Sequence, residues 1–169
     1  MNAASVSARQ ALELLQADAW GVALGLPLGT LVLADVRMGR LDQVADLLAE
    51  PFPEAMLRSR YGLHYLYARG HYRLATGQAR SALADFLQCG KPTPRWALRG
   101  TGPVPWRTSA AEARLRLGKQ DQAGLLARDE LSRLSPDSHR ARGLALRVVE
   151  QHLTRTFRKL DVKRRQDLS

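Results

Sequence analysis

The sequence has little cysteine and few aromatic residues. Its 169 residues include one cysteine, Cys89, so no disulfide can form within the chain, which is typical of proteins of a reducing cytoplasm. Aromatic residues make up 6%, while alanine, leucine and arginine are abundant. This mixture favours helices that pack through small and aliphatic side chains. We therefore expect an all-α, cytoplasmic protein in which Cys89 is a small buried hydrophobic residue, with a reactive thiol as the alternative.

Long hydrophobic runs are also missing. The longest, residues 22–34, is too short to cross a bilayer and contains Pro27. The first residues show no basic segment followed by an apolar core, so we expect no signal peptide and no membrane partner. The run 22–34 is interpreted as a buried helix–turn–helix segment.

The sequence lacks the motifs of the common catalytic and cofactor sites. Asp85 stands where a phosphate-binding loop before Lys91 needs its first glycine, and residues 100–105 lack the third glycine of a dinucleotide loop. His64 and His71 share a helical face but lie two turns apart, about 10 Å along the axis, which is too far for one metal ion. We therefore predict that the protein is not an enzyme and holds no cofactor or metal.

Acidic residues are too few to balance the basic ones. The chain has 26 Lys and Arg against 16 Asp and Glu, a formal net charge of +10. Such a surface attracts phosphate backbones and acidic partners. A solvated, arginine-rich face gives the same composition, so charge alone leaves both interpretations open.

What the sequence does contain is a repeat built on glycines. Gly39, Gly77 and Gly118 are spaced by 38 and 41 residues, a period typical of stacked helical hairpins. Each is followed five residues later by a small or β-branched residue, and four residues after that by another apolar or small one. These pairs are Val44 and Leu48, Ala82 and Phe86, and Ala123 and Ala127.

The repeat predicts the architecture. A glycine ends the first helix in a left-handed conformation, and the small residue then lets the second helix approach closely. The middle unit resembles a tetratricopeptide repeat most closely. We expect an all-α solenoid of stacked antiparallel, tetratricopeptide-like hairpins over residues 1–135, with an exposed apolar end that could dock a protein partner. The expected helices span about 5–17, 28–38, 41–49, 60–76, 78–89, 106–117 and 119–134, with a long loop at 89–107.

The last part of the chain, residues 136–169, is predicted to form one long helix from Pro136 to about Leu160 and a short terminal helix. Ser135 and Pro136 are a helix-start signal, and Gly143 is a weak point inside the helix. An apolar stripe runs along this helix at Val149, Leu153, Phe157 and Leu160. The other face is basic and polar, which suits either solvent or the major groove of DNA.

Residues 149–168, "VEQHLTRTFRKLDVKRRQDL", resemble the recognition helix and last helix of LuxR-type helix-turn-helix domains. Upstream, residues 65–90 and 103–118 resemble the tetratricopeptide-like region of large ATP-dependent LuxR-type regulators. The resemblance implies a recognition helix at about 148–160 and a last helix at about 162–168. The positions that it implies for DNA contact are Glu150, Gln151, Thr154, Arg155, Arg158, Lys159, Arg164 and Arg165.

The chain also departs from that family. The ATPase module and the front half of the helix-turn-helix domain are absent, Val148 replaces the usual threonine, and Asp161 replaces the usual glycine. A recognition helix depends on other helices to hold it on the duplex, so we expect weak or non-specific DNA binding. The sequence thus predicts a truncated LuxR-type transcriptional regulator with a helical-repeat scaffold for a protein partner and a possible homodimer. The alternative is a stand-alone helical-repeat interaction module with no specific DNA binding.

Overall fold

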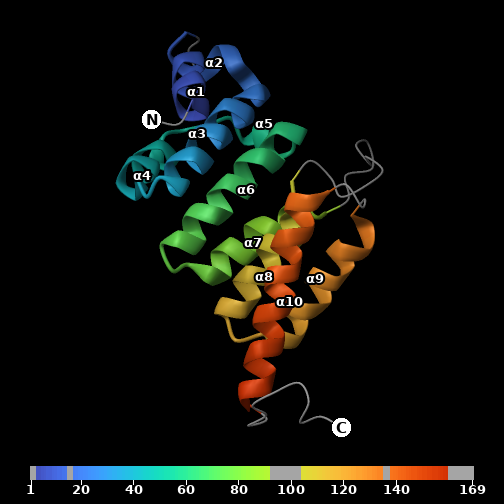
Figure 1. The fold of residues 1–169 in the computed structure, drawn as a ribbon. Helices are drawn as coiled ribbons and strands as arrows, with labels where there is room; N and C mark the ends of the chain where they lie inside the picture. Colours follow the sequence, from blue (N-terminus) through green and yellow to red (C-terminus); the bar gives the residue numbers. More distant parts are fainter. Residues whose placement is uncertain (1–2, 15–16, 92–103, 135–137, 160–169) are drawn as a thin grey trace.

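The computed structural model describes residues 3–14, 17–91, 104–134 and 138–159, and within these ranges it contains helices and turns but no strand. The all-α prediction is therefore confirmed (Figure 1). The helices are α1 Ala3–Leu14, α2 Ala17–Trp20, the 3-10 helix η1 Gly21–Leu24, α3 Gly25–Arg37, α4 Leu41–Ala49, α5 Glu54–Leu57, α6 Arg60–Ala75, α7 Ala79–Cys89, α8 Trp106–Arg116, α9 Gln120–Arg133 and α10 His139–Lys159.

The three predicted hairpin turns share one geometry. Gly39, Gly77 and Gly118 have φ angles of 74°, 79° and 74°, the left-handed conformation that glycine adopts at least cost. In the first turn the Gly39 N–H donates to Val36 O at 3.1 Å and the Arg40 N–H donates to Asp35 O at 2.9 Å. This pair of bonds is the Schellman motif, which satisfies carbonyls that the helix end leaves free. In the second turn the N–H groups of Gly77 and Gln78 donate to Leu74 O and Arg73 O. In the third turn the N–H groups of Gly118 and Lys119 donate to Leu115 O and Arg114 O.

The small residues that follow each turn lie in the core, as predicted. Val44, Ala82 and Ala123 are fully buried, and so are Phe86 and Ala127. The crossing of α6 and α7 also needs a small residue on α6, at Gly70. A Cβ atom on Gly70 would lie 2.5 Å from a Phe86 ring carbon, so a larger residue would force these helices apart.

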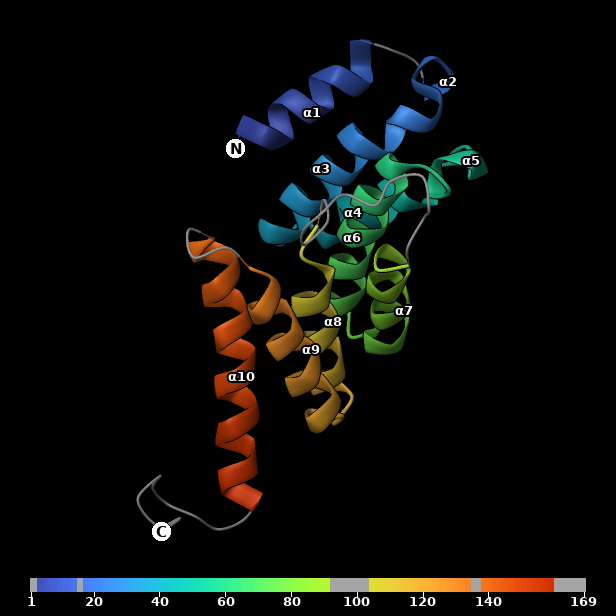
Figure 2. The same ribbon diagram turned by 90° about the vertical axis from the view of Figure 1, so that its right-hand side faces the viewer.

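The hairpins stack in chain order. In each of α3–α4, α6–α7 and α8–α9 a Schellman turn joins the two helices; α6 packs against α3, α7 against α8, and α9 against α10. Figure 2 shows the lower part of the molecule in this order, from α7 through α8 and α9 to α10. Helix α1 covers the far side of α3. Each helix thus contacts mainly its neighbours in the stack, which is the pattern of a solenoid.

Helix α10 adds the first helix of a further unit to this stack. Ala145 and Val148 are buried on it, and Val148 packs with Ala111 of α8 and Ala123 of α9. The helix passes through Gly143 and through the predicted start of the recognition helix without a break. In both views its last turns extend beyond the turn between α8 and α9 (Figures 1 and 2). The predicted last helix at 162–168 lies outside the described residues.

The interpretation of residues 22–34 as a helix–turn–helix is wrong. η1 runs directly into α3, and no turn separates them. Pro27 does not break α3, because it lies in the first turn, where a backbone N–H has no helical partner to lose. The short helices α2 and α5 were not predicted either. The segment is buried only in part: Leu28, Leu31 and Val32 are less than 10% exposed, whereas Val22 is 40% and Leu26 is 50% exposed.

The N-terminal end of the stack carries exposed apolar side chains, in agreement with expectation. Leu14 is 82% exposed and Leu26 is 50% exposed. Among the described helices none is both long and apolar enough to cross a bilayer. The predicted long loop falls between the end of α7 and the start of α8, and residues 92–103 within it lie outside the described part of the chain.

Candidate binding groove

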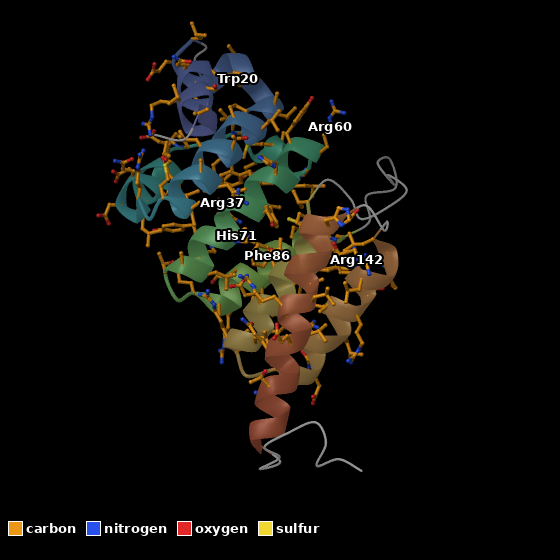
Figure 3. The ribbon with its side chains drawn as sticks, viewed as in Figure 1. Trp20, Arg37, Arg60, His71, Phe86 and Arg142 are labelled. Carbon is orange, nitrogen blue, oxygen red and sulfur yellow. The ribbon has the colours of Figure 1, made fainter. Side chains whose placement is uncertain are left out.

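A cavity of about 240 Å³ opens where α3, α6, α8 and α10 face one another. We call it the groove. Arg37 of α3 and His71 of α6 line it, and Figure 3 shows both side chains on these neighbouring helices. Successive units of the stack contribute one wall each, so the groove exists only because the hairpins pack in register. Thr108 and Ser109 of α8 and Leu144 and Val148 of α10 form part of its other walls.

The floor of the groove is polar and uncharged. The Ser109 hydroxyl donates to Tyr67 Oη over 3.4 Å and lies 3.2 Å from His71 Nε2. The pKa of His71 is lowered to about 4, mainly by burial and in addition by the nearby positive charges of Arg37 and Arg116. Burial also raises the pKa of Tyr67. At neutral pH both rings are therefore uncharged and can act only as hydrogen-bonding groups.

One floor hydroxyl has no partner. Thr108 is 8% exposed, and its Oγ1 makes no hydrogen bond within the described part of the chain. A buried hydroxyl without a partner costs about 1–3 kcal/mol. Because Thr108 lines the groove, a ligand could supply the missing bond.

The rim of the groove is charged. Arg37 and Arg147 lie on opposite sides of it, on α3 and α10, and both are exposed. Neither forms an ion pair with any residue of the described ranges. Among the described lining residues Glu112 is the only carboxylate; its Oε1 lies 3.2 Å from Arg116 Nη2 and is therefore already paired. Two cations at the mouth of the groove are thus left without an anion.

Arginines elsewhere in the stack are engaged with the scaffold. Arg69 and Arg73 hold the buried Asp85 carboxylate at 2.7 Å and 2.8 Å and join α6 to α7. Arg107 joins α8 to α9 through Asp129 at 2.8 Å. The basic excess of the composition therefore includes arginines that stabilise the hairpins, which the net charge alone could not reveal.

Of the residues predicted for DNA contact, the structure describes the side chains of three. Glu150, Gln151 and Thr154 are exposed on α10, and Gln151 also lines the groove beside Arg147. Arg155, Arg158 and Lys159 belong to α10, but their side chains lie outside the described structure, as do Arg164 and Arg165 altogether.

The other two chemical predictions can be compared directly. Cys89 is 7% exposed, so the prediction that it is a small buried residue is confirmed, and burial raises the pKa of its thiol to about 12. His64 lies 3.2 Å from Thr30 Oγ1 and is partly buried. No cluster of three metal-ligating side chains occurs among the described residues.

Sequence reasoning missed the groove itself. Tyr67, Thr108 and Ser109 carry no motif, and they meet only because α6 and α8 pack side by side. The only available signal was the repeat itself, because stacked helical hairpins present a concave surface.

No family model matches the sequence, and no characterised protein or solved structure matches the chain at a significant level. The similarity of residues 149–168 to LuxR-type domains therefore stays a prediction.

Proposed function

We propose that this protein is a helical-repeat interaction module whose groove binds an extended segment of a protein partner. The observation that carries the proposal is the groove itself, a cavity of about 240 Å³ walled by helices of successive units. Stacked helical hairpins serve as scaffolds of this kind because they present a continuous inner surface without chemistry of their own.

The residues that line the groove offer both apolar and hydrogen-bonding contacts to a partner. Leu144 and Val148 supply apolar contact area, while Thr108 offers a hydroxyl without a partner. Binding sites typically combine an apolar lining with a few polar groups that fix orientation. A cavity of this size accepts a side chain, and the open rim lets the main chain of a partner continue past it.

Photo-crosslinking tests this proposal. A benzophenone side chain placed at Gln151, on the rim of the groove, should capture a discrete partner in cells that produce the protein. The same side chain at Arg128, which is exposed on α9 and does not line the groove, is the matched control. Crosslinks of equal yield at both positions, or none at Gln151, would contradict a groove-bound partner.

A DNA-binding regulator of the LuxR type is the second candidate. The last turns of α10 project beyond the stack (Figures 1 and 2), and Glu150 and Thr154 are exposed on this helix. A projecting helix is the element that enters a major groove. Against this, Val148 is buried on α8 and α9, so one face of the helix is already occupied.

Salt titration of DNA binding separates the two candidates. We expect at most weak binding of any duplex, with an affinity that falls steeply with salt, because phosphate contacts dominate such binding. Glutamine at Arg155, Arg158, Arg164 and Arg165 should abolish it and leave the Gln151 crosslink intact. Sequence-selective binding that survives physiological salt would establish the regulator instead.

A further inference from the structure

We infer that the groove recognises an acidic segment of its partner, with an aspartate or glutamate carboxylate seated between Arg37 and Arg147. The inference rests on the proposed interaction function and names the chemistry of the partner. It is argued from the charges of the rim, the hydrogen-bonding groups of the floor and the size of the cavity.

The rim charges favour an anion. Arg37 and Arg147 both line the groove, and neither has an ion-pair partner among the residues that the structure describes. Glu112 does not neutralise them, because its carboxylate is paired with Arg116 at 3.2 Å. A guanidinium binds a carboxylate through charge-assisted hydrogen bonds, which are stronger than neutral ones.

The floor favours an acceptor rather than another donor. Thr108 lines the cavity, and its buried Oγ1 has no partner within the described ranges, so its hydroxyl proton is available to a carboxylate oxygen. His71 and Ser109 already share a contact of 3.2 Å and carry no charge at neutral pH, so they do not oppose an anion. A carboxylate in the groove would therefore meet the guanidinium groups of Arg37 and Arg147 at the rim and the hydroxyl of Thr108 in the floor.

The shape favours a peptide over a nucleic acid. A cavity of about 240 Å³ accommodates one side chain. Duplex DNA is read by protein elements that protrude into its grooves, and a recess in the protein surface offers no such element. An extended acidic segment places one carboxylate in the recess and leaves its main chain along α6 and α8.

Fluorescence polarisation with defined peptides tests the inference. The probe is a labelled peptide of alternating glutamate and serine, and its twin carries glutamine in place of every glutamate. The wild-type chain should bind the acidic peptide and bind the twin at least about tenfold more weakly. Equal binding of both peptides would overturn the inference.

A matched pair of double variants removes the effect of net charge. Arg37→Gln with Arg147→Gln should weaken binding of the acidic peptide roughly tenfold. Arg80→Gln with Arg128→Gln removes the same charge from exposed positions outside the groove and should change the affinity less than about twofold. If both pairs weaken binding equally, the attraction is general and the inference fails.

Thr108→Val should change peptide affinity without lowering stability, whereas loss of a purely structural contact would lower stability. The substitution removes a hydroxyl that has no partner among the described residues, so the urea midpoint should stay the same or rise. Binding of the acidic peptide should nevertheless weaken several-fold. A variant that loses stability and keeps its affinity would contradict the role of this hydroxyl in the site.

Two further outcomes separate this inference from the proposed function. A single-stranded oligonucleotide that binds more tightly than the acidic peptide, with the same dependence on Arg37 and Arg147, would overturn the peptide in favour of nucleic acid. A partner captured at Gln151 whose binding is indifferent to Arg37 and Arg147 would leave the interaction module standing and overturn only its acidic preference.

Discussion

At the scale of single residues, glycine has opposite effects at two kinds of position. Gly77 has a φ of 79° and closes a hairpin, whereas Gly143 lies inside α10 with ordinary helical geometry. A Cβ atom would meet nothing within 4 Å at either position. Steric crowding is therefore excluded, and only backbone conformation distinguishes them.

Alanine at these two positions should consequently change stability in opposite directions. Gly77→Ala should lower the free energy of unfolding by about 1–2 kcal/mol, because a side chain disfavours the left-handed conformation. Gly143→Ala should raise it by about 0.5–1 kcal/mol, since alanine is the better helix former. Urea unfolding of both variants measures this, and a change of the same sign in both would contradict the assignment of the turn.

A second residue-scale prediction concerns pH. The pKa of His71 is lowered to about 4 in the folded protein from 6.5, mainly by burial. As pH falls from about 6.5 towards 4, His71 is protonated in the unfolded chain but stays neutral in the folded chain. The free energy of unfolding therefore falls in this window, by up to about 3 kcal/mol.

The control variant is His71→Gln, which cannot titrate. Its stability should fall less than that of the wild type between about pH 7.5 and about pH 4.5, as measured by urea midpoints. His64 titrates in the same direction and is retained in both proteins, so it cancels in the comparison. Parallel losses of stability would show that His71 does not carry the effect.

At the scale of elements, α10 belongs to the stack. Val148 is 3% exposed against α8 and α9, whereas Leu146 is 52% exposed on the same helix. Val148→Ala should cost about 1–2.5 kcal/mol and Leu146→Ala less than about 0.5 kcal/mol. Denaturation of the two variants tests this. If Val148→Ala costs no more than Leu146→Ala, α10 does not depend on its packing against the repeats.

Sequence patterns predicted the main helices because local signals define them. Gly39, Gly77 and Gly118 marked all three hairpin turns, and the expected helix at 41–49 agrees with α4 in both bounds. The short helices α2 and α5 escaped prediction because four residues show no periodicity. The run 22–34 was misjudged as two helices with a turn, although Pro27 occupies a first helical turn, where proline is tolerated.

The groove could not be predicted because it depends on long-range packing. Tyr67 and Ser109 lie 42 residues apart and meet through a 3.4 Å hydrogen bond. No pattern in the sequence shows which polar residues of two helices will face one recess. The repeat indicates that stacked hairpins present a surface to partners, whereas the residues of the groove required the structure.

At the scale of the whole molecule, the crossing of α3 and α6 connects the N-terminal hairpin to the rest. A Cβ atom on Gly25 would lie 2.5 Å from the backbone oxygen of Tyr61, so no side-chain adjustment can relieve it. Gly25→Ala should therefore loosen this crossing at a cost of about 1–3 kcal/mol.

Native-state hydrogen exchange locates the effect of that variant. Because solenoid units interact with their neighbours, amide protection should fall in α1, α3 and α4 and persist in α8, α9 and α10. Gly143→Ala serves as the control, since Gly143 lies at the opposite end of the stack and a Cβ atom there would meet no atom within 4 Å. A uniform loss of protection along the chain would indicate one cooperative unit instead.

The repeated turns also have a consequence for how quickly the chain reaches its native state. Each Schellman turn joins residues five positions apart, as in the bond from Arg40 to Asp35, so a hairpin closes with little loss of loop entropy. Proteins dominated by such local contacts fold fast. During synthesis each hairpin is therefore expected to close soon after its second helix leaves the ribosome, and its buried face then becomes the template on which the next helix docks.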